Sequence, residues 1–72
     1  MLPTPRQIEV LRLWAEGYTF KEIAFQLGVT TKTVEAHKAS GMERLGFSSR
    51  VELVRYALKV GWLRDEGNCG VR

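Results

Sequence analysis

Start and stop signals for helices recur four times along this chain and divide nearly all of it into short segments. Each predicted helix begins with a hydroxyl side chain that can accept a hydrogen bond from the first turn: Thr4, Thr19, Thr30 and Ser49. Three of these caps are completed three residues later by a side chain that bonds back to the cap: Gln7, Glu22 and Glu52. Glycines suited to a left-handed helix end follow three of the segments: Gly17, Gly28 and Gly61. No segment alternates polar and apolar residues with a period of two, so the sequence predicts an all-α fold of four helices.

The second and third helices are the closest pair in the sequence. Only Gly28 and Val29 lie between the second helix and the Thr30 cap of the third. Two helices joined by a glycine-containing turn this short are typical of a helix-turn-helix unit. The third helix runs to about Leu45, and in such a unit it is the helix that enters the major groove of DNA.

The third helix has two distinct faces when its residues are placed about 100° apart. One face is apolar and is predicted to be buried: Val34, Gly41 and Leu45. The opposite face combines short and charged side chains: Lys32, Glu35, Ala36, Ala39 and Glu43. Small side chains let a helix lie deep in a groove roughly 12 Å wide, and a glutamate can accept a hydrogen bond from cytosine. The same face is equally typical of a helix that simply meets solvent.

Gly41 is unusual because glycine in a helix interior costs about 1 kcal/mol relative to alanine. It falls on the apolar face, where a large side chain is expected. We expect close packing at this point, with an aromatic side chain lying over the bare backbone: Trp14, Phe25 or Trp62. The alternative is a weakened helix that bends on DNA.

The apolar residues of the fourth helix cover an arc too broad for one buried stripe. One set is predicted to face the core: Val51, Val54, Ala57 and Leu58. A second set lies on another side and is predicted to form a homodimer interface: Leu53, Tyr56 and Val60. A chain of 72 residues buries only about 60% of its unfolded surface, so oligomerisation is expected on size alone. The alternative is a helix buried within its own domain, with Trp62 covering the second set.

Composition narrows the classes of function. One His, one Cys and no clustered acidic residues leave no metal site, cofactor site or catalytic constellation, so the chain is not expected to be an enzyme. The net charge of +3 permits binding to nucleic acid. Apolar residues never run long enough to cross a bilayer, so we expect no membrane partner and a cytoplasmic protein. We assign residues 1–63 to one domain and residues 64–72, which contain Cys69, to a flexible tail.

Five stretches of the sequence carry a specific pattern when they are taken together. They are "TPRQIEVLRL", "EGYTFKEIAFQLGV", "TTKTVEAHKA", "ERLGF" and "SRVELVRYA". This pattern closely resembles the LuxR/GerE-type DNA-binding domain over residues 2 to about 60. The resemblance implies a bacterial transcriptional regulator whose third helix enters the major groove and whose fourth helix pairs two subunits. It further implies a homodimer, weak without DNA, that binds an inverted repeat in double-stranded DNA, with RNA polymerase as a candidate partner.

The resemblance also assigns roles to individual residues. Positions that read bases in the family correspond to Glu35, Ala36 and Ala39, with Lys38 beside them. Positions that meet backbone phosphates correspond to Lys21, Thr31, Lys32, Thr33 and Arg44. Glu35 and Ala39 stand where family members often carry Lys or Arg, and Gly41 stands where they usually carry Ile or Met. The target sequence of the family therefore does not carry over to this chain.

Two other functions fit parts of the sequence. Region 4 of a sigma factor also contains a helix-turn-helix unit, but it usually ends soon after its recognition helix, whereas this chain continues into a capped fourth helix. The other alternative is a small protein-interaction module that has lost DNA binding, which the acidic Glu35 favours. A stand-alone regulator and a piece of a longer regulator with an N-terminal sensing domain both fit a sequence that begins directly before the domain.

Overall fold

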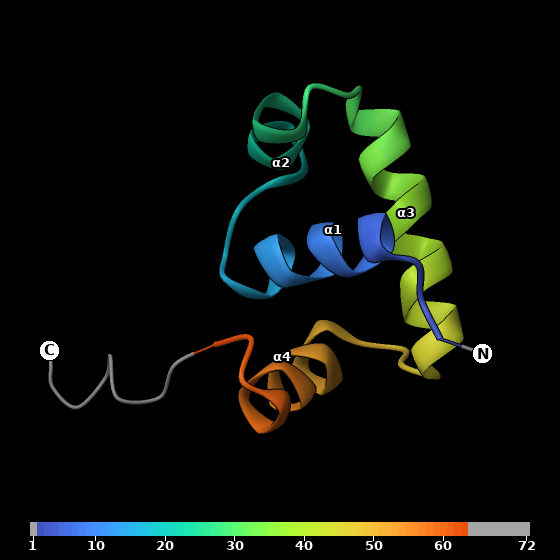
Figure 1. The fold of residues 1–72 in the computed structure, drawn as a ribbon, viewed down its shortest axis with the longest axis vertical. Helices are drawn as coiled ribbons and strands as arrows, with labels where there is room; N and C mark the ends of the chain where they lie inside the picture. The colour runs from blue at the N-terminus through green and yellow to red at the C-terminus, as the bar shows by residue number, and fades with distance from the viewer. Residues whose placement is uncertain (1, 64–72) are drawn as a thin grey trace, which may run out of the picture.

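The computed structural model describes residues 2–63, and four helices form within this range. They are α1 (Pro5–Ala15), α2 (Phe20–Leu27), α3 (Thr31–Leu45) and α4 (Arg50–Val60). α1 lies in the middle of the molecule, with α2 on one side of it and α4 on the other, while α3 runs along the edge of the group (Figure 1). The predicted all-α fold is confirmed. The predicted tail 64–72, with Cys69, lies outside the described residues.

The local signals at the helix starts are confirmed bond by bond. At the start of α1, Thr4 Oγ1 accepts from the Gln7 N–H at 3.2 Å, and Gln7 Oε1 accepts from the Thr4 N–H at 2.9 Å. The same reciprocal pair joins Thr19 and Glu22 at the start of α2, at 3.1 and 2.8 Å. A third capping box begins α4. Because these bonds join residues only three apart, the sequence alone could predict them.

The turn between α2 and α3 depends on Gly28. Its φ of 71° is left-handed, a conformation that residues with a Cβ rarely adopt. The N–H of Gly28 bonds back to the Ala24 carbonyl, which closes the last turn of α2. The chain then needs only Val29 before the Thr30 cap of α3, so the two helices are held as a compact helix-turn-helix unit.

Two separate groups of buried side chains hold the helices together. The first joins α1, α2 and α3: Val10, Ile23, Ala24 and Val34. The second joins α1, α3 and α4: Leu11, Ala15, Met42, Leu53 and Ala57. Trp14, half-buried near the end of α1, packs against both groups. α1 therefore connects the helix-turn-helix unit to α4.

Gly41 packs closely against α1, and the predicted close packing is confirmed. A Cβ atom at this residue would lie 2.7 Å from Leu11 Cδ1 and 3.4 Å from Gln7 Cβ. The expectation of an aromatic cover was wrong, because the neighbours are Leu11 and Gln7 of α1 and the Phe25 side chain is 88% exposed. The Gln7 side chain has two roles, because it caps the start of α1 and also packs against α3 at Gly41.

None of the helices within residues 2–63 is long and apolar enough to cross a membrane.

Candidate nucleic-acid interface

The face of α3 opposite the core carries the residues predicted to read bases. Glu35, Ala36 and Ala39 are all exposed, with Lys32 toward the start of the helix and Glu43 toward its end. The opposite face is buried through Val34, Gly41 and Met42. The predicted orientation of α3 is therefore confirmed, and two methyl groups and one carboxylate form the centre of its exposed face.

The N-terminus of α3 presents hydroxyl groups and an ammonium group. Thr30 Oγ1 accepts from the Thr33 N–H at 3.1 Å and lies 3.0 Å from Thr33 Oγ1. Thr31 and Lys32 are exposed beside this cap, while Thr33 is half-buried. The first turn contains no acidic residue. This end therefore combines free helix N–H groups, hydroxyl donors and a positive charge, the groups that hold phosphate oxygens.

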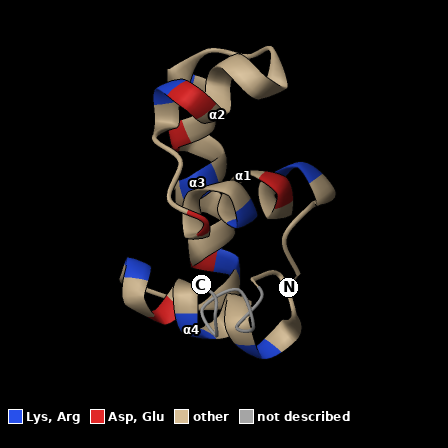
Figure 2. Ribbon diagram, turned by 90° about the vertical axis from the view of Figure 1, so that its left-hand side faces the viewer, with Lys and Arg blue, Asp and Glu red and all other residues tan. Residues whose placement is uncertain are grey.

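Two further predicted phosphate contacts lie away from the N-terminus of α3. Lys21 is exposed on the first turn of α2. Arg44 is exposed in the last turn of α3, where its Nη1 donates to the Leu2 carbonyl at 3.3 Å. Figure 2 shows that basic and acidic residues alternate along the helices instead of gathering on one element. The net charge therefore does not show which surface faces DNA. That surface has to be located from the positions of individual Lys and Arg side chains.

Lys38 occupies a different environment from the other predicted base contacts. Its Nζ atom lies 5.2 Å from the centroid of the Trp14 ring and 6.0 Å from that of Phe20. The residue is half-buried, at the border between the exposed and buried faces of α3. The sequence did not predict this contact, because the two aromatic residues belong to α1 and α2. The angular positions of residues around α3 alone carry no information about neighbouring helices.

The predicted division of α4 into a core side and an interface side was wrong. Leu53, assigned to the homodimer interface, is fully buried, so it cannot touch a second subunit. Tyr56, also assigned to the interface, is half-buried with its ring between Phe47 and Trp62, at centroid distances of 5.4 and 5.3 Å. Only Val60 of that set is an exposed hydrophobic residue, at 46%.

Two of the four α4 residues assigned to the core instead face outward. Val51 and Leu58 are 61% and 43% exposed, and Val54 between them is half-buried. These three residues are spaced three and four apart, so they form one stripe on the helix. Of the predicted core set, Ala57 alone is buried. The helical period placed Val51 and Leu58 on one side correctly, but it put the buried Ala57 with them and the exposed Val60 with Leu53.

Arg50 is a contact that the sequence did not single out. Its Nη2 donates to the Trp14 carbonyl at 2.7 Å, and its guanidinium carbon lies 5.0 Å from the centroid of the Trp14 ring. Arg50 is the first residue of α4, and Trp14 lies in the last turn of α1. A cation here satisfies a carbonyl near the C-terminal end of α1, where the helix dipole favours positive charge.

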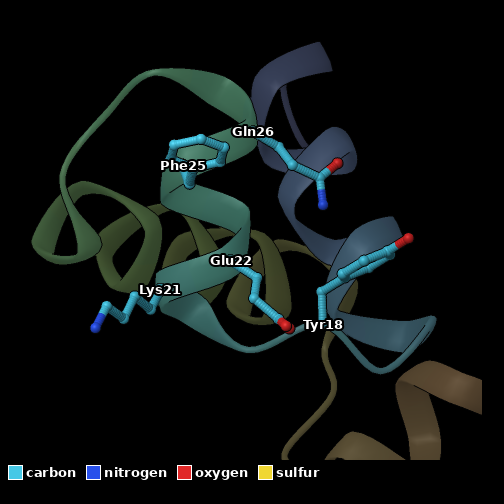
Figure 3. A pocket seen from close by; sticks show the side chains of 5 residues that line it. All are labelled: Tyr18, Lys21, Glu22, Phe25 and Gln26. Carbon is cyan, nitrogen blue, oxygen red and sulfur yellow. The ribbon is translucent and has the colours of Figure 1, made fainter.

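An open hollow of about 370 Å³ lies on the outer side of α2. Its lining comes from α2 and the loop before it: Tyr18, Lys21, Glu22, Phe25 and Gln26 (Figure 3). Phe25, 88% exposed, is its most prominent apolar group. Lys21 therefore belongs both to this hollow and to the predicted set of phosphate contacts.

The carboxyl group of Glu52 lies at the start of α4, where it takes part in the capping box. The pKa of Glu52 is lowered, chiefly by a hydrogen bond from the Ser48 N–H, with further bonds from the Ser49 N–H and the Ser48 hydroxyl. This carboxylate caps α4 and lies outside the exposed face of α3. Acidic residues, His and Cys form no group that could hold a metal ion within the described range.

Residues 2–57, which span α1, α2, α3 and most of α4, match the family described as bacterial regulatory proteins, luxR family. The chain belongs to this family. LuxR-family proteins are DNA-binding transcriptional regulators, and this chain carries their helix-turn-helix domain. The family consists of regulators rather than enzymes, and its match continues into α4, which favours it over region 4 of a sigma factor.

Two relatives of this LuxR-family chain illustrate the similarity. The oxygen regulatory protein NreC of Staphylococcus aureus is 57% identical over 54 residues, which make up 75% of this chain and 25% of that protein. A solved structure of the RcsB response regulator of Salmonella typhimurium, described for conformational dynamism in DNA interaction, matches with a TM-score of 0.70. The two chains are 41% identical, and the match covers 75% of this chain and 26% of the RcsB chain. The chain spans about a quarter of the length of both relatives.

Proposed function

We propose that this domain binds double-stranded DNA sequence-specifically, with the N-terminal half of α3 in the major groove. The observation that carries the proposal is the exposed face of α3, where Ala36 and Ala39 leave a shallow surface next to Glu35. Alanine methyl groups can contact thymine methyl groups, and a glutamate can accept a hydrogen bond from cytosine N4. Base reading is thus assigned to these three residues, and Lys38 reaches a base edge only when its amine leaves the rings of Trp14 and Phe20.

The phosphate contacts are proposed to flank this reading face. Thr31, Lys32 and Thr33 surround the N-terminus of α3, where one strand of the duplex would pass. Lys21 and Arg44 would hold phosphates at the two ends of the footprint. At the third position of the helix, α2 and α4 carry the acidic Glu22 and Glu52, whereas α3 carries the neutral Thr33. A neutral side chain at this position avoids repulsion of a phosphate.

A homodimer on an inverted repeat is proposed to form through α4, with a corrected interface. The stripe formed by the exposed Val51 and Leu58 with the half-buried Val54 would meet its copy across a two-fold axis. This stripe is small, so association is weak in solution and is strengthened when two half-sites about one DNA turn apart hold two copies together. Such a regulator would act in the bacterial cytoplasm, with RNA polymerase as a candidate partner.

The salt dependence of DNA binding tests the proposal. The slope of log K against log salt is negative, and each phosphate contact that is lost should make it less negative by about 0.9. Lys32→Ala with Arg44→Ala should therefore weaken binding to every duplex and flatten this slope. Arg12→Ala is the control, since Arg12 is an exposed cation of α1 that pairs with Glu16 at 3.9 Å. An unchanged slope in the double variant would refute this surface, whereas no binding by the unsubstituted chain at low salt would favour a protein-interaction module.

A further inference from the structure

The Trp14 ring in α1 lies close to a side chain from each of the other three helices. Its ring centroid lies 5.9 Å from that of Phe20, the first residue of α2. The amine of Lys38 from α3 and the guanidinium of Arg50 from α4 lie 5.2 and 5.0 Å from the same ring. Trp14 also packs against both groups of buried residues. All four helices therefore meet at one indole.

The attachment of α4 to this indole is directional. Arg50 Nη2 donates to the Trp14 carbonyl at 2.7 Å while its guanidinium lies near the ring of the same residue. A planar guanidinium that binds a carbonyl and stacks on an aromatic ring is fixed in both position and tilt. Since Arg50 begins α4, its geometry fixes where that helix starts relative to the end of α1.

The attachment of α3 lies next to the proposed reading face. Lys38 immediately precedes Ala39, one of the residues assigned to base reading. A cation over an aromatic ring is attracted by the ring quadrupole, and Trp is the strongest such partner among the side chains. The contact therefore links α3 to the indole at the turn proposed to enter the groove.

We propose that Trp14 is a positioning residue that sets the orientation of α3 relative to α4, and through it the half-site spacing that a dimer accepts. The inference rests on the proposed function. In a symmetric dimer the two recognition helices are related through two α4 helices, so an angular error between α3 and α4 enters twice. Trp14 itself contacts no DNA in this arrangement and acts through Lys38 and Arg50.

Duplexes with two half-sites, separated in steps of one base pair, test this role. The unsubstituted chain should bind cooperatively at one optimal spacing and lose roughly tenfold in cooperativity one base pair away, since each step also rotates the half-sites about the duplex axis. Trp14→Leu keeps an apolar side chain but removes the aromatic ring and should reduce this difference to about threefold or less. Arg50→Gln should do the same, and because Arg50 is exposed it tests the role even where Trp14→Leu fails to fold.

The controls separate positioning from simple loss of stability. Arg12→Gln removes an exposed cation from α1 without touching the indole and should keep the sharp optimum. Affinity for a single half-site, measured well below the unfolding temperature, should stay within about threefold in all variants. A spacing profile that remains sharp in Arg50→Gln and in folded Trp14→Leu would overturn the inference, as would a flat profile for the unsubstituted chain. Failure of the unsubstituted chain to bind a half-site would overturn the proposed function together with this inference.

Discussion

Gly41 in α3 and Leu11 in α1 are so close that a Cβ atom on Gly41 would lie 2.7 Å from Leu11 Cδ1 and 3.2 Å from Leu11 Cγ. Leu11 is fully buried, so its side chain has no open space into which it could turn. The missing side chain at residue 41 therefore sets the distance between the two helices. The glycine lowers the helix propensity of α3, and the close packing compensates for it.

Gly41→Ala is expected to destabilise the domain. Overpacking a filled core costs about 1–3 kcal/mol, and a contact of 2.7 Å with the fully buried Leu11 favours the upper part of this range, which exceeds the gain of about 1 kcal/mol in helix propensity. Urea unfolding of the two proteins measures the difference. Combining Gly41→Ala with Leu11→Val should recover part of the loss, because the shorter side chain makes room for the methyl group. A clear gain in stability from Gly41→Ala alone would contradict the packing argument.

Glu35→Ala is expected to relax the choice of base at one position of the target. Discrimination there should fall by about 1–3 kcal/mol, the range for a specific contact to a base edge. Binding to unrelated duplexes should strengthen at low salt, since a charge repelled by phosphate has been removed. Glu43→Ala, exposed nearer the end of α3, is the matched control. Glu43→Ala should strengthen nonspecific binding but leave the selected DNA sequence unchanged. If Glu35→Ala and the unsubstituted chain select the same DNA sequence, Glu35 does not read a base.

Leu58→Glu is expected to abolish cooperative binding to an inverted repeat while half-site binding persists. Leu58 is 43% exposed, so a charge there meets its copy at the proposed interface without entering the core. Tyr56→Glu would be a poor test, because Tyr56 packs between Phe47 and Trp62 and its loss would disturb the fold. Val60→Glu controls for a new charge on α4, since Val60 is 46% exposed and lies outside the stripe of Val51, Val54 and Leu58. Cooperativity equal in both variants would place the dimer interface elsewhere.

Glu52→Gln is expected to lower stability at neutral pH and to matter less in acid. The pKa of Glu52 is lowered from its ordinary 4.5, first by the Ser48 N–H, so the carboxylate stabilises the folded state above that pH. This contribution is lost as the pH falls through the lower pKa of the folded state. Urea midpoints of the two proteins should therefore converge below pH 4.5. A difference that stays constant through the acid range would show that the charge of Glu52 has no part in capping α4.

The boundaries of all four helices within residues 2–63 could be predicted because their signals are local. A cap such as Thr19, its partner Glu22 and the glycine at residue 28 act within a few residues of the chain, and each was found where the sequence placed it. The exposed face of α3 was also predictable. The helical period separates Val34 from Glu35 and Ala39, and only one of the two faces is apolar.

The arrangement between helices could not be predicted in the same way. Both sides of α4 are apolar, so the helical period groups Val51 with Leu58 and Leu53 with Tyr56 without showing which group meets α1. The partner of Gly41 was likewise set by the crossing of α1 over α3 and not by the sequence near residue 41. Contacts such as Lys38 with Trp14 join residues far apart in the chain, and no local signal marks them.

The separation of the buried side chains into two groups gives this domain two regions that can open one at a time. α4 is held through Leu53 and Ala57, whereas α2 is held against α3 through Ile23 and Val34 in the other group. A fluctuation that releases α4 would break the first group and leave the second intact, as happens when proteins open in cooperative units. Proteases cut such open forms. Pairing of two α4 helices on a DNA target would prevent this release of α4. Binding to the target would then protect the regulator from proteolysis and lengthen its lifetime.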